Sequence, residues 1–119
     1  MIYYTYRIMH VDIKSPSTFI TRVYTTSIKD GKKKDIKLKV VYDDGKIYFT
    51  RRNKRSSWYK NLLINDKAEF ELGGKIFYGT AKEMNDQNLI SHISQIKYSN
   101  EKKDEPRYGF EIKIKGEIT

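Results

Sequence analysis

The sequence has no cysteine, and its 119 residues include only two histidines, two prolines and one tryptophan. Without cysteine the chain can form no disulfide, thiolate nucleophile or zinc–sulfur site. No stretch approaches the roughly 18 consecutive apolar residues that a membrane helix needs. The opening residues MIYYTYRIMHVDIK contain neither a basic segment nor a small-residue cleavage site of the kind found in signal peptides. We therefore expect a cytoplasmic protein with no membrane segment.

Residues that commonly carry catalysis are also scarce. The histidines, His10 and His92, belong to no ligand-like cluster and to no Ser/His/Asp pattern. The carboxylates form no evident pair for acid–base chemistry. The sequence thus predicts no catalytic residue and no metal site, and an enzyme of this composition would depend on a bound cofactor for its chemistry.

Positive charge, by contrast, is abundant and unevenly distributed. The formal net charge is +9, and residues 29–60 hold 12 of the 24 Lys and Arg residues but only four of the 15 Asp and Glu residues. Charge concentrated in one segment favours a binding site for an anion over a general role in solubility.

The pattern of apolar residues predicts a mainly β fold in a single domain over residues 1–119. Period-two stretches separated by Asp-Gly and Gly-Gly turns indicate antiparallel strands, and two stretches with helical spacing interrupt them. The predicted order is β-β-β-α-β-β-α-β, which suggests a small barrel with helices at its ends. Residues 1–12 fit a strand and a short helix equally poorly. The predicted strands cover 18–27, 35–42, 46–50, 67–72, 75–83 and 108–117, and the helices begin near Ser57 and Asp86.

The densest positive charge lies in the segment YFTRRNKRSSWYKNL, where Arg51, Arg52, Lys54 and Arg55 precede the first predicted helix. A helix N-terminus exposes unpaired N–H groups and suits a phosphate, to which arginine side chains and the hydroxyls of the following Ser-Ser pair can add hydrogen bonds. We expect Arg52 to contribute more than Arg55, because neighbouring loop positions cannot all face one groove. The competing interpretation is a solvated loop.

Other residues near this junction also allow two interpretations. Lys37 and Lys39 share one face of a predicted strand, so they fit either a barrel exterior or a phosphate groove. Trp58, at the start of the helix, is more typical of a core or interface than of a ligand platform. The run Lys32–Lys34 is most simply a solvated hairpin tip.

Residues 23–98 resemble the flavin-binding split-barrel superfamily, the group of pyridoxamine 5′-phosphate oxidase. They are most like its branch of deazaflavin-dependent nitroreductases. The resemblance rests on a strand ending in Thr, a basic turn with Gly, a short Asp-Gly hairpin and the helix motif Trp-Tyr-x-Asn-Leu at residues 58–62. The branch usually has Gly-Arg-Lys-Ser/Thr-Gly in its first turn, where this chain has SIKDG. It also has Asn-Pro after the helix, where this chain has Asn65-Asp66.

The resemblance implies a dimeric, six-stranded antiparallel split β-barrel that binds FMN or a deazaflavin (coenzyme F-420) between subunits. Carried over by position, it implies a cofactor groove in which the charged junction takes part. The predicted cofactor-binding residues are Lys29, Lys37, Lys39, Thr50, Arg51, Arg52, Lys54, Arg55, Ser56, Ser57, Trp58, Lys60 and Asn61.

Three functions are compatible with these features. The first is a flavin- or deazaflavin-dependent oxidoreductase that moves a hydride between its cofactor and a small substrate. The second is a basic small-barrel protein that binds nucleic acid, for which basic strands interleaved with tyrosines are suitable. The third is a cofactor-binding protein without turnover. Residues 61–119 contain nine basic and ten acidic residues, so they offer no extended positive track for nucleic acid. The first function is therefore favoured.

Overall fold

The computed structural model describes residues 4–8, 11–100, 102 and 105–118. In chain order the elements are β1 (Tyr4–Ile8), β2 (Val11–Ser15), β3 (Ser17–Thr26), β4 (Lys33–Asp43), β5 (Lys46–Arg51), α1 (Ser57–Ile64), β6 (Lys67–Leu72), β7 (Lys75–Glu83), α2 (Gln87–Lys97) and β8 (Tyr108–Ile118). From β3 onwards this is the predicted order, and the prediction of a mainly β fold is confirmed. His10 lies outside the described residues.

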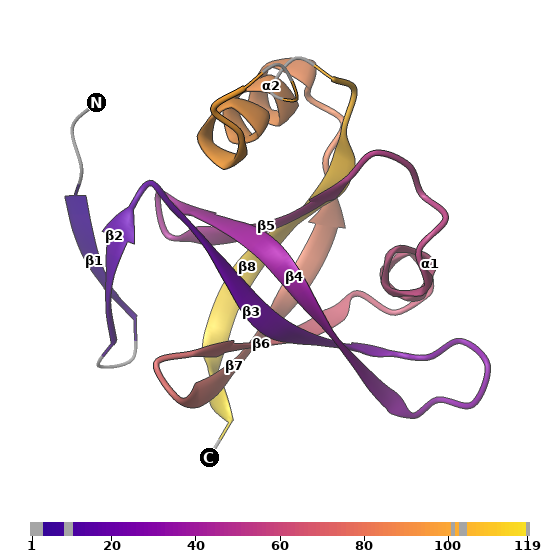
Figure 1. Cartoon of the computed structure of the whole chain (residues 1–119). Helices are drawn as coiled ribbons and strands as arrows, with labels where there is room; N and C mark the ends of the chain where they lie inside the picture. The colour runs from indigo at the N-terminus through magenta and orange to yellow at the C-terminus, as the bar shows by residue number, and fades with distance from the viewer. Residues whose placement is uncertain (1–3, 9–10, 101, 103–104, 119) are drawn as a thin grey trace.

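Six antiparallel strands close into a barrel in the order β3-β4-β5-β8-β7-β6 (Figure 1). The three tight hairpins predicted from glycine turns are present as the pairs β3–β4, β4–β5 and β6–β7. Three pairings that no local pattern indicates complete the closure: β8 pairs with β5 and with β7, and β3 pairs with β6 through Val23 and Phe70. Closure leaves the barrel without a free strand edge.

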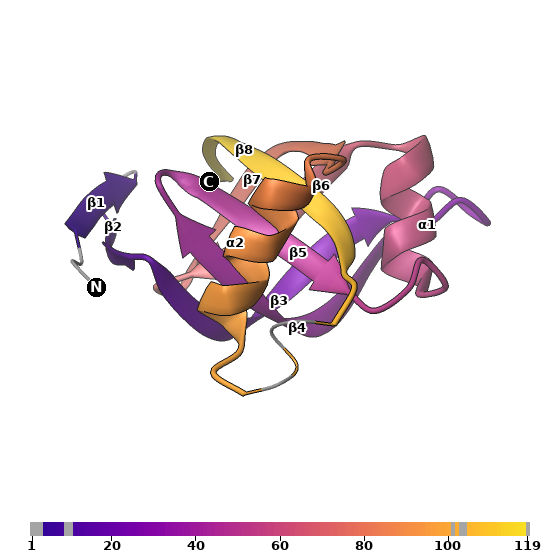
Figure 2. The same ribbon diagram turned by 90° about the horizontal axis from the view of Figure 1, so that it is seen from above.

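The N-terminal residues form a separate two-stranded hairpin, in which Tyr4 lies opposite Ser15 and Ile8 opposite Val11. The hairpin projects from the end of the barrel opposite α1, as both views show (Figures 1 and 2). Its attachment includes the buried Ile13 and a hydrogen bond from the Asp44 amide to the Ser15 hydroxyl (2.9 Å). Residues 4–8 and 11–15 are therefore strands, and the short-helix interpretation of this region is wrong for them.

The main hydrophobic core fills the barrel and extends to the end that α1 covers. Alternate residues of the strands point inward, among them Val40, Phe49 and Phe70, and α1 adds Trp58 and Leu62. A helix of only eight residues is marginal by itself, so this buried face is what holds α1 on the barrel. Asn65 ends the helix, as predicted, with its amide bonded to the carbonyl of Asn61 (2.8 Å).

A second, smaller core lies between the outside of the barrel and α2 (Figure 2). Val41 and Tyr48, which point outward from neighbouring strands, pack there against Ile90 and Ile93 of the helix. Asp86 caps α2 as predicted, because its side chain accepts from the amide of Asn88 (2.9 Å). The outer face of β4 is therefore divided into a stretch that α2 covers and a basic stretch that remains exposed.

Gly79 marks the point where β7 and β8 are tightest. A Cβ atom there would lie 2.3 Å from the carbonyl oxygen of Lys113, so only glycine fits without displacing the neighbouring backbone. The register of the two strands shifts between Tyr78 and Gly79. Bulges of this kind increase the local twist and help a sheet to close. Neither helix in the described part of the chain is long and apolar enough to cross a membrane.

Candidate functional site

A pocket of about 590 Å³ opens between α1 and the turn that joins β3 to β4. Three segments contribute its walls: the end of β3 with the following turn, the start of β4, and the first turns of α1. The lining residues are Thr25, Ser27, Ile28, Lys29, Asp30, Lys34, Asp35, Ile36, Ser56, Ser57, Trp58, Lys60 and Asn61. The pocket therefore contains the helix N-terminus that the sequence indicated.

Asn61 joins two of these walls. Its side-chain Nδ2 donates to the Thr25 hydroxyl (3.0 Å), and its Oδ1 accepts from the backbone amide of Ile28 (3.3 Å). The residue is buried; its bond to Thr25 is shielded from water, and its bond to Ile28 is partly shielded. The asparagine of the Trp-Tyr-x-Asn-Leu motif thus fixes the β3–β4 turn against α1.

The turn itself is held by hydrogen bonds within its own residues. The Ser27 amide donates to the Lys32 carbonyl (2.8 Å), and the Gly31 amide donates to the Ser27 carbonyl (2.9 Å). Gly31 has φ of +70°, a conformation that glycine adopts at little cost. The Lys29 amide donates to the Ser27 hydroxyl (3.2 Å). This wall of the pocket is therefore a defined turn.

Two polar atoms of α1 have no hydrogen-bond partner among the described residues. These are the indole Nε1 of Trp58 and the hydroxyl of Ser56, both of them buried atoms. Ser56 occupies the N-cap position, as predicted, but its hydroxyl makes no capping bond. An indole N–H can only donate, and a buried donor without an acceptor is costly. Both residues line the pocket, so an acceptor bound there would satisfy them.

Trp58 is a core residue as well as a pocket residue. Its ring lies edge-on to Phe49, with centroids 6.0 Å apart, and contacts Phe110 at 6.4 Å. It is 3 % exposed. The expectation of a core position for this tryptophan is therefore confirmed, and the residue also lines the pocket.

Charge in the pocket is partly compensated. Lys34 pairs with Asp30 (3.4 Å), and Asp35 pairs with Arg22. Lys29 and Lys60 line the pocket and form no ion pair with any described residue. Two uncompensated cations beside a helix N-terminus give the pocket a positive potential, which suits an anionic ligand.

The pocket includes six of the residues predicted for the site, namely Lys29, Ser56, Ser57, Trp58, Lys60 and Asn61. It also includes residues of the β3–β4 turn that the sequence analysis missed. The Asp30-Gly31 hairpin signal located this turn, but nothing local indicated that it would pack against α1. Thr25, Ser27, Ile28, Asp30, Lys34, Asp35 and Ile36 were not predicted.

The other predicted residues lie outside the pocket lining, and most have protein partners. Arg52 pairs with Glu105 (Nε to Oε2, 3.5 Å), and Lys54 pairs with Glu83 (3.1 Å). The Tyr59 hydroxyl also donates to Glu83 (2.5 Å), and this bond, together with Lys54, holds the pKa of that carboxyl below its usual value. Arg55 is exposed, as is Lys37 on β4. All three turn lysines are exposed, as expected of a solvated hairpin tip, and two of them form ion pairs: Lys33 with Glu69 (2.8 Å) and Lys34 with Asp30 (3.4 Å).

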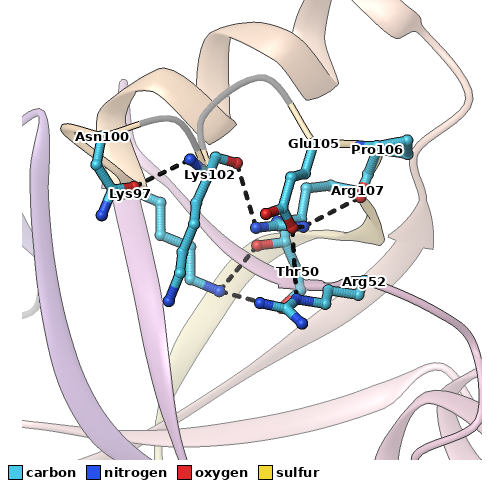
Figure 3. Close-up of polar contacts among 8 residues, drawn as sticks. All are labelled: Thr50, Arg52, Lys97, Asn100, Lys102, Glu105, Pro106 and Arg107. Atoms are coloured by element: carbon cyan, nitrogen blue, oxygen red, sulfur yellow. Dashed lines mark hydrogen bonds and ion pairs between the residues drawn. The ribbon is translucent and has the colours of Figure 1, made fainter.

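Thr50 lies beside Lys97 at the C-terminal end of α2 (Figure 3). Arg51 and Lys39 belong to the same group, because both are near enough to Lys97 to lower its pKa. Lys97, on the buried face of α2, donates from Nζ to the carbonyl oxygen of Thr50 (3.1 Å) and to its hydroxyl (3.0 Å). Burial, and after it the nearby charges of Arg107, Lys39 and Arg51, lower the pKa of Lys97 to about 8. Lys97 was not singled out from the sequence, although it continues the spacing of Ile90 and Ile93.

Comparisons with known proteins agree with this architecture. No family model matches the sequence, and no curated protein matches it either. Among solved structures, an F-420-H2-dependent reductase is 24% identical, with a TM-score of 0.63 over 78% of this chain and 92% of its own. A chain described as a domain-swapped dimer has the same identity and TM-score over 78% of both chains. An FAD-binding protein from Mesorhizobium loti is 17% identical, with a TM-score of 0.62 over 84% of this chain and 86% of its own.

This chain therefore has the fold of the flavin- and deazaflavin-binding split barrels, as the resemblance predicted. At these identities the likeness establishes the architecture. Within the described residues no group of three or more His, Asp or Glu side chains is placed to hold a metal ion.

The buried charge of Lys97 predicts how stability depends on pH. An unfolded lysine titrates near 10.4, whereas folded Lys97 titrates near 8. Below pH 8 both states are protonated, so the full cost of burying the charge is present. Between these two pKa values the unfolded state binds more protons, and the free energy of unfolding rises with pH.

We expect wild type to gain about 1 kcal/mol of stability from pH 7 to pH 9 relative to Lys97→Met, which has no such charge. Urea unfolding of both proteins at several pH values within this range measures the difference. Identical pH slopes for the two proteins would contradict the lowered pKa.

Proposed function

We propose that the pocket binds the phosphate-bearing cofactor FMN or coenzyme F-420, and that the protein is a split-barrel oxidoreductase. The bound cofactor supplies hydride transfer to or from a small substrate. The observation that carries the proposal is the buried, unpartnered indole N–H of Trp58 beside the unpartnered hydroxyl of Ser56. Flavin-type rings and phosphates both carry hydrogen-bond acceptors, so the donors present fit this class of cofactor.

The chain's own residues have distinct roles in this proposal. Lys29 and Lys60 balance the negative charge of the phosphate, and the hydroxyls and N–H groups at the start of α1 hold its oxygens. Trp58 donates to an acceptor of the ring system. Asn61 touches the pocket wall and positions the β3–β4 turn through its two hydrogen bonds. No protein acid or base is needed for hydride transfer itself, which agrees with the scarcity of catalytic side chains.

The proteins of similar structure support the class of cofactor. One is an F-420-H2-dependent reductase and another binds FAD. Nucleic-acid binding is less well supported, because two of the junction cations, Arg52 and Lys54, are paired with carboxylates. A cofactor-binding protein without turnover would share the same pocket.

Substitution of a pocket lysine tests the binding site. A charge-assisted hydrogen bond contributes about 1.5–3 kcal/mol, so Lys60→Ala should weaken cofactor binding about tenfold or more. Lys37→Ala is the matched control, because it removes an exposed cation that does not line the pocket. Arg52→Ala should also have little effect, since its guanidinium pairs with Glu105. Titration of FMN and of coenzyme F-420, followed by cofactor fluorescence, measures each dissociation constant.

Two outcomes of this titration would contradict the proposed cofactor site. If wild type binds neither cofactor better than at millimolar concentration, the pocket has another ligand. If Lys37→Ala or Arg52→Ala is as damaging as Lys60→Ala, the phosphate is held elsewhere on the barrel.

We further propose that the protein is a homodimer whose interface lies at the rim of the pocket. Ile28 and Ile36 line the pocket and are 53% and 42% exposed, an apolar edge that a second subunit would cover. A chain of similar structure forms a domain-swapped dimer. Each subunit would then help to shield the cofactor of the other from water.

Light scattering after size exclusion should give twice the chain mass of 14.2 kDa. Ile28→Glu/Ile36→Glu should shift the protein towards the monomer, because a charge buried at an interface is costly. Ile64→Glu is the control, since Ile64 is 76% exposed and lies outside the pocket. A wild-type monomer at micromolar concentration would refute the dimer.

A further inference from the structure

Cations gather around the aromatic ring of Tyr98, just beyond the end of α2. Lys39 Nζ and Lys97 Nζ each lie 5.4 Å from the ring centroid, and the guanidinium carbon of Arg107 lies 4.7 Å from it. Lys97 is 8% exposed and Arg107 is 4% exposed. Arg51, at the end of β5, is near enough to Lys97 to lower its pKa. These four cations and Tyr98 form the α2-end cluster.

The carboxylate of Glu105 contacts the cluster but does not neutralise its positive charge. Glu105 Oε2 accepts from Arg107 (3.2 Å) and pairs with Arg52 (3.5 Å), so it is shared between two guanidinium groups (Figure 3). Lys97 bonds only to the neutral oxygens of Thr50. Among the described residues the cluster therefore retains a large excess of positive charge.

Arg107 has hydrogen-bonding capacity that the protein leaves unused. Its terminal nitrogens donate to the carbonyl oxygens of Pro106 and Lys102, both at 3.2 Å, and to Glu105. Its Nε is buried and has no partner among the described residues. Arginine stays protonated in proteins, so the buried Nε–H cannot be removed by loss of a proton. A buried guanidinium with an unused donor therefore indicates a missing acceptor.

The cluster has an inner part that is buried and an outer rim that is exposed. Lys97 and Arg107 form the buried inner part, whereas Lys39 and Arg51 are exposed and form the rim. Buried charges are stable when they are paired. A ligand that carries negative charge, approaching between the rim cations, would supply the pairing that is missing among the described residues.

We propose that the α2-end cluster is a second anion site, which binds a phosphate group. A dianion matches the excess charge better than a monocarboxylate does, because Glu105 already supplies one negative charge and leaves most of the cluster uncompensated. Arginine and lysine together are the usual partners of phosphate oxygens. The group belongs either to free phosphate or to a small phosphorylated molecule.

This site is separate from the pocket between α1 and the β3–β4 turn. It shares no residue with the pocket lining. The two helices lie on different parts of the barrel, α1 across one end and α2 along a side (Figures 1 and 2). A failure of cofactor binding in the pocket would therefore leave the proposal of a second site unaffected.

Titration with inorganic phosphate at constant ionic strength tests the site, with backbone amide shifts in NMR spectra as the readout. The amides of Thr50, Lys97 and Arg107 should shift along one saturable curve. Acetate, a monocarboxylate, should bind at least about tenfold more weakly. Adenosine monophosphate is the third ligand: tighter binding than inorganic phosphate assigns the site to a phosphorylated small molecule, and equal binding assigns it to free phosphate.

A double variant with a charge-matched control separates specific binding from general attraction. Lys39→Gln/Arg51→Gln removes two exposed rim cations and should weaken phosphate binding about tenfold or more. Lys82→Gln/Lys115→Gln removes the same charge from exposed positions on β7 and β8 and should change binding less than about twofold. Amide spectra of both variants without ligand show whether they are folded.

Three results would overturn the proposal. One is the absence of a saturable shift at Thr50, Lys97 and Arg107. A second is equal weakening in the two double variants, and a third is acetate binding as tightly as phosphate. Shifts confined to residues 56–61 would likewise place the anion in the pocket and not at the α2-end cluster.

Discussion

The buried amide of Asn61 is the interaction on which the geometry of the pocket depends. It bonds to Thr25 and to the amide of Ile28, and so holds the β3–β4 turn against α1. If it were lost, two buried groups would be left unsatisfied, at about 1–3 kcal/mol each. The helix is in turn fixed by Trp58 and Leu62, which are packed into the barrel core. A rigid core, a short helix and one amide thus place the start of α1 relative to the turn.

The same barrel separates its positive charge into two regions. One is the pocket, where Lys29 and Lys60 lie beside a helix N-terminus. The other is the α2-end cluster, where Lys97 and Arg107 are buried and make their polar contacts largely with neutral oxygens. Between the two, acidic side chains such as Glu83 hold the junction cations. These two regions hold only part of the formal charge of +9, because exposed lysines such as Lys82 and Lys115 lie in neither.

Much of this fold could be predicted from the sequence, because strand periodicity, glycine turns and the Asp86 cap are local signals. The Trp-Tyr-x-Asn-Leu motif likewise located the helical wall of the pocket. Contacts between distant segments could not be predicted. Arg52 and Lys54 stand next to the helix in sequence, but partners at residues 105 and 83 hold them elsewhere. Lys97 was not among the predicted site residues, because its contact with Thr50 joins positions 47 residues apart in the sequence.

A crystal structure of the protein with FMN or coenzyme F-420 tests the central claim, that the pocket is the cofactor site, most directly. The account predicts the cofactor phosphate within hydrogen-bonding distance of Ser56 or Ser57 and Lys60, with an acceptor of the cofactor facing Nε1 of Trp58. A cofactor bound away from α1, with the Trp58 indole still unpartnered, would contradict it.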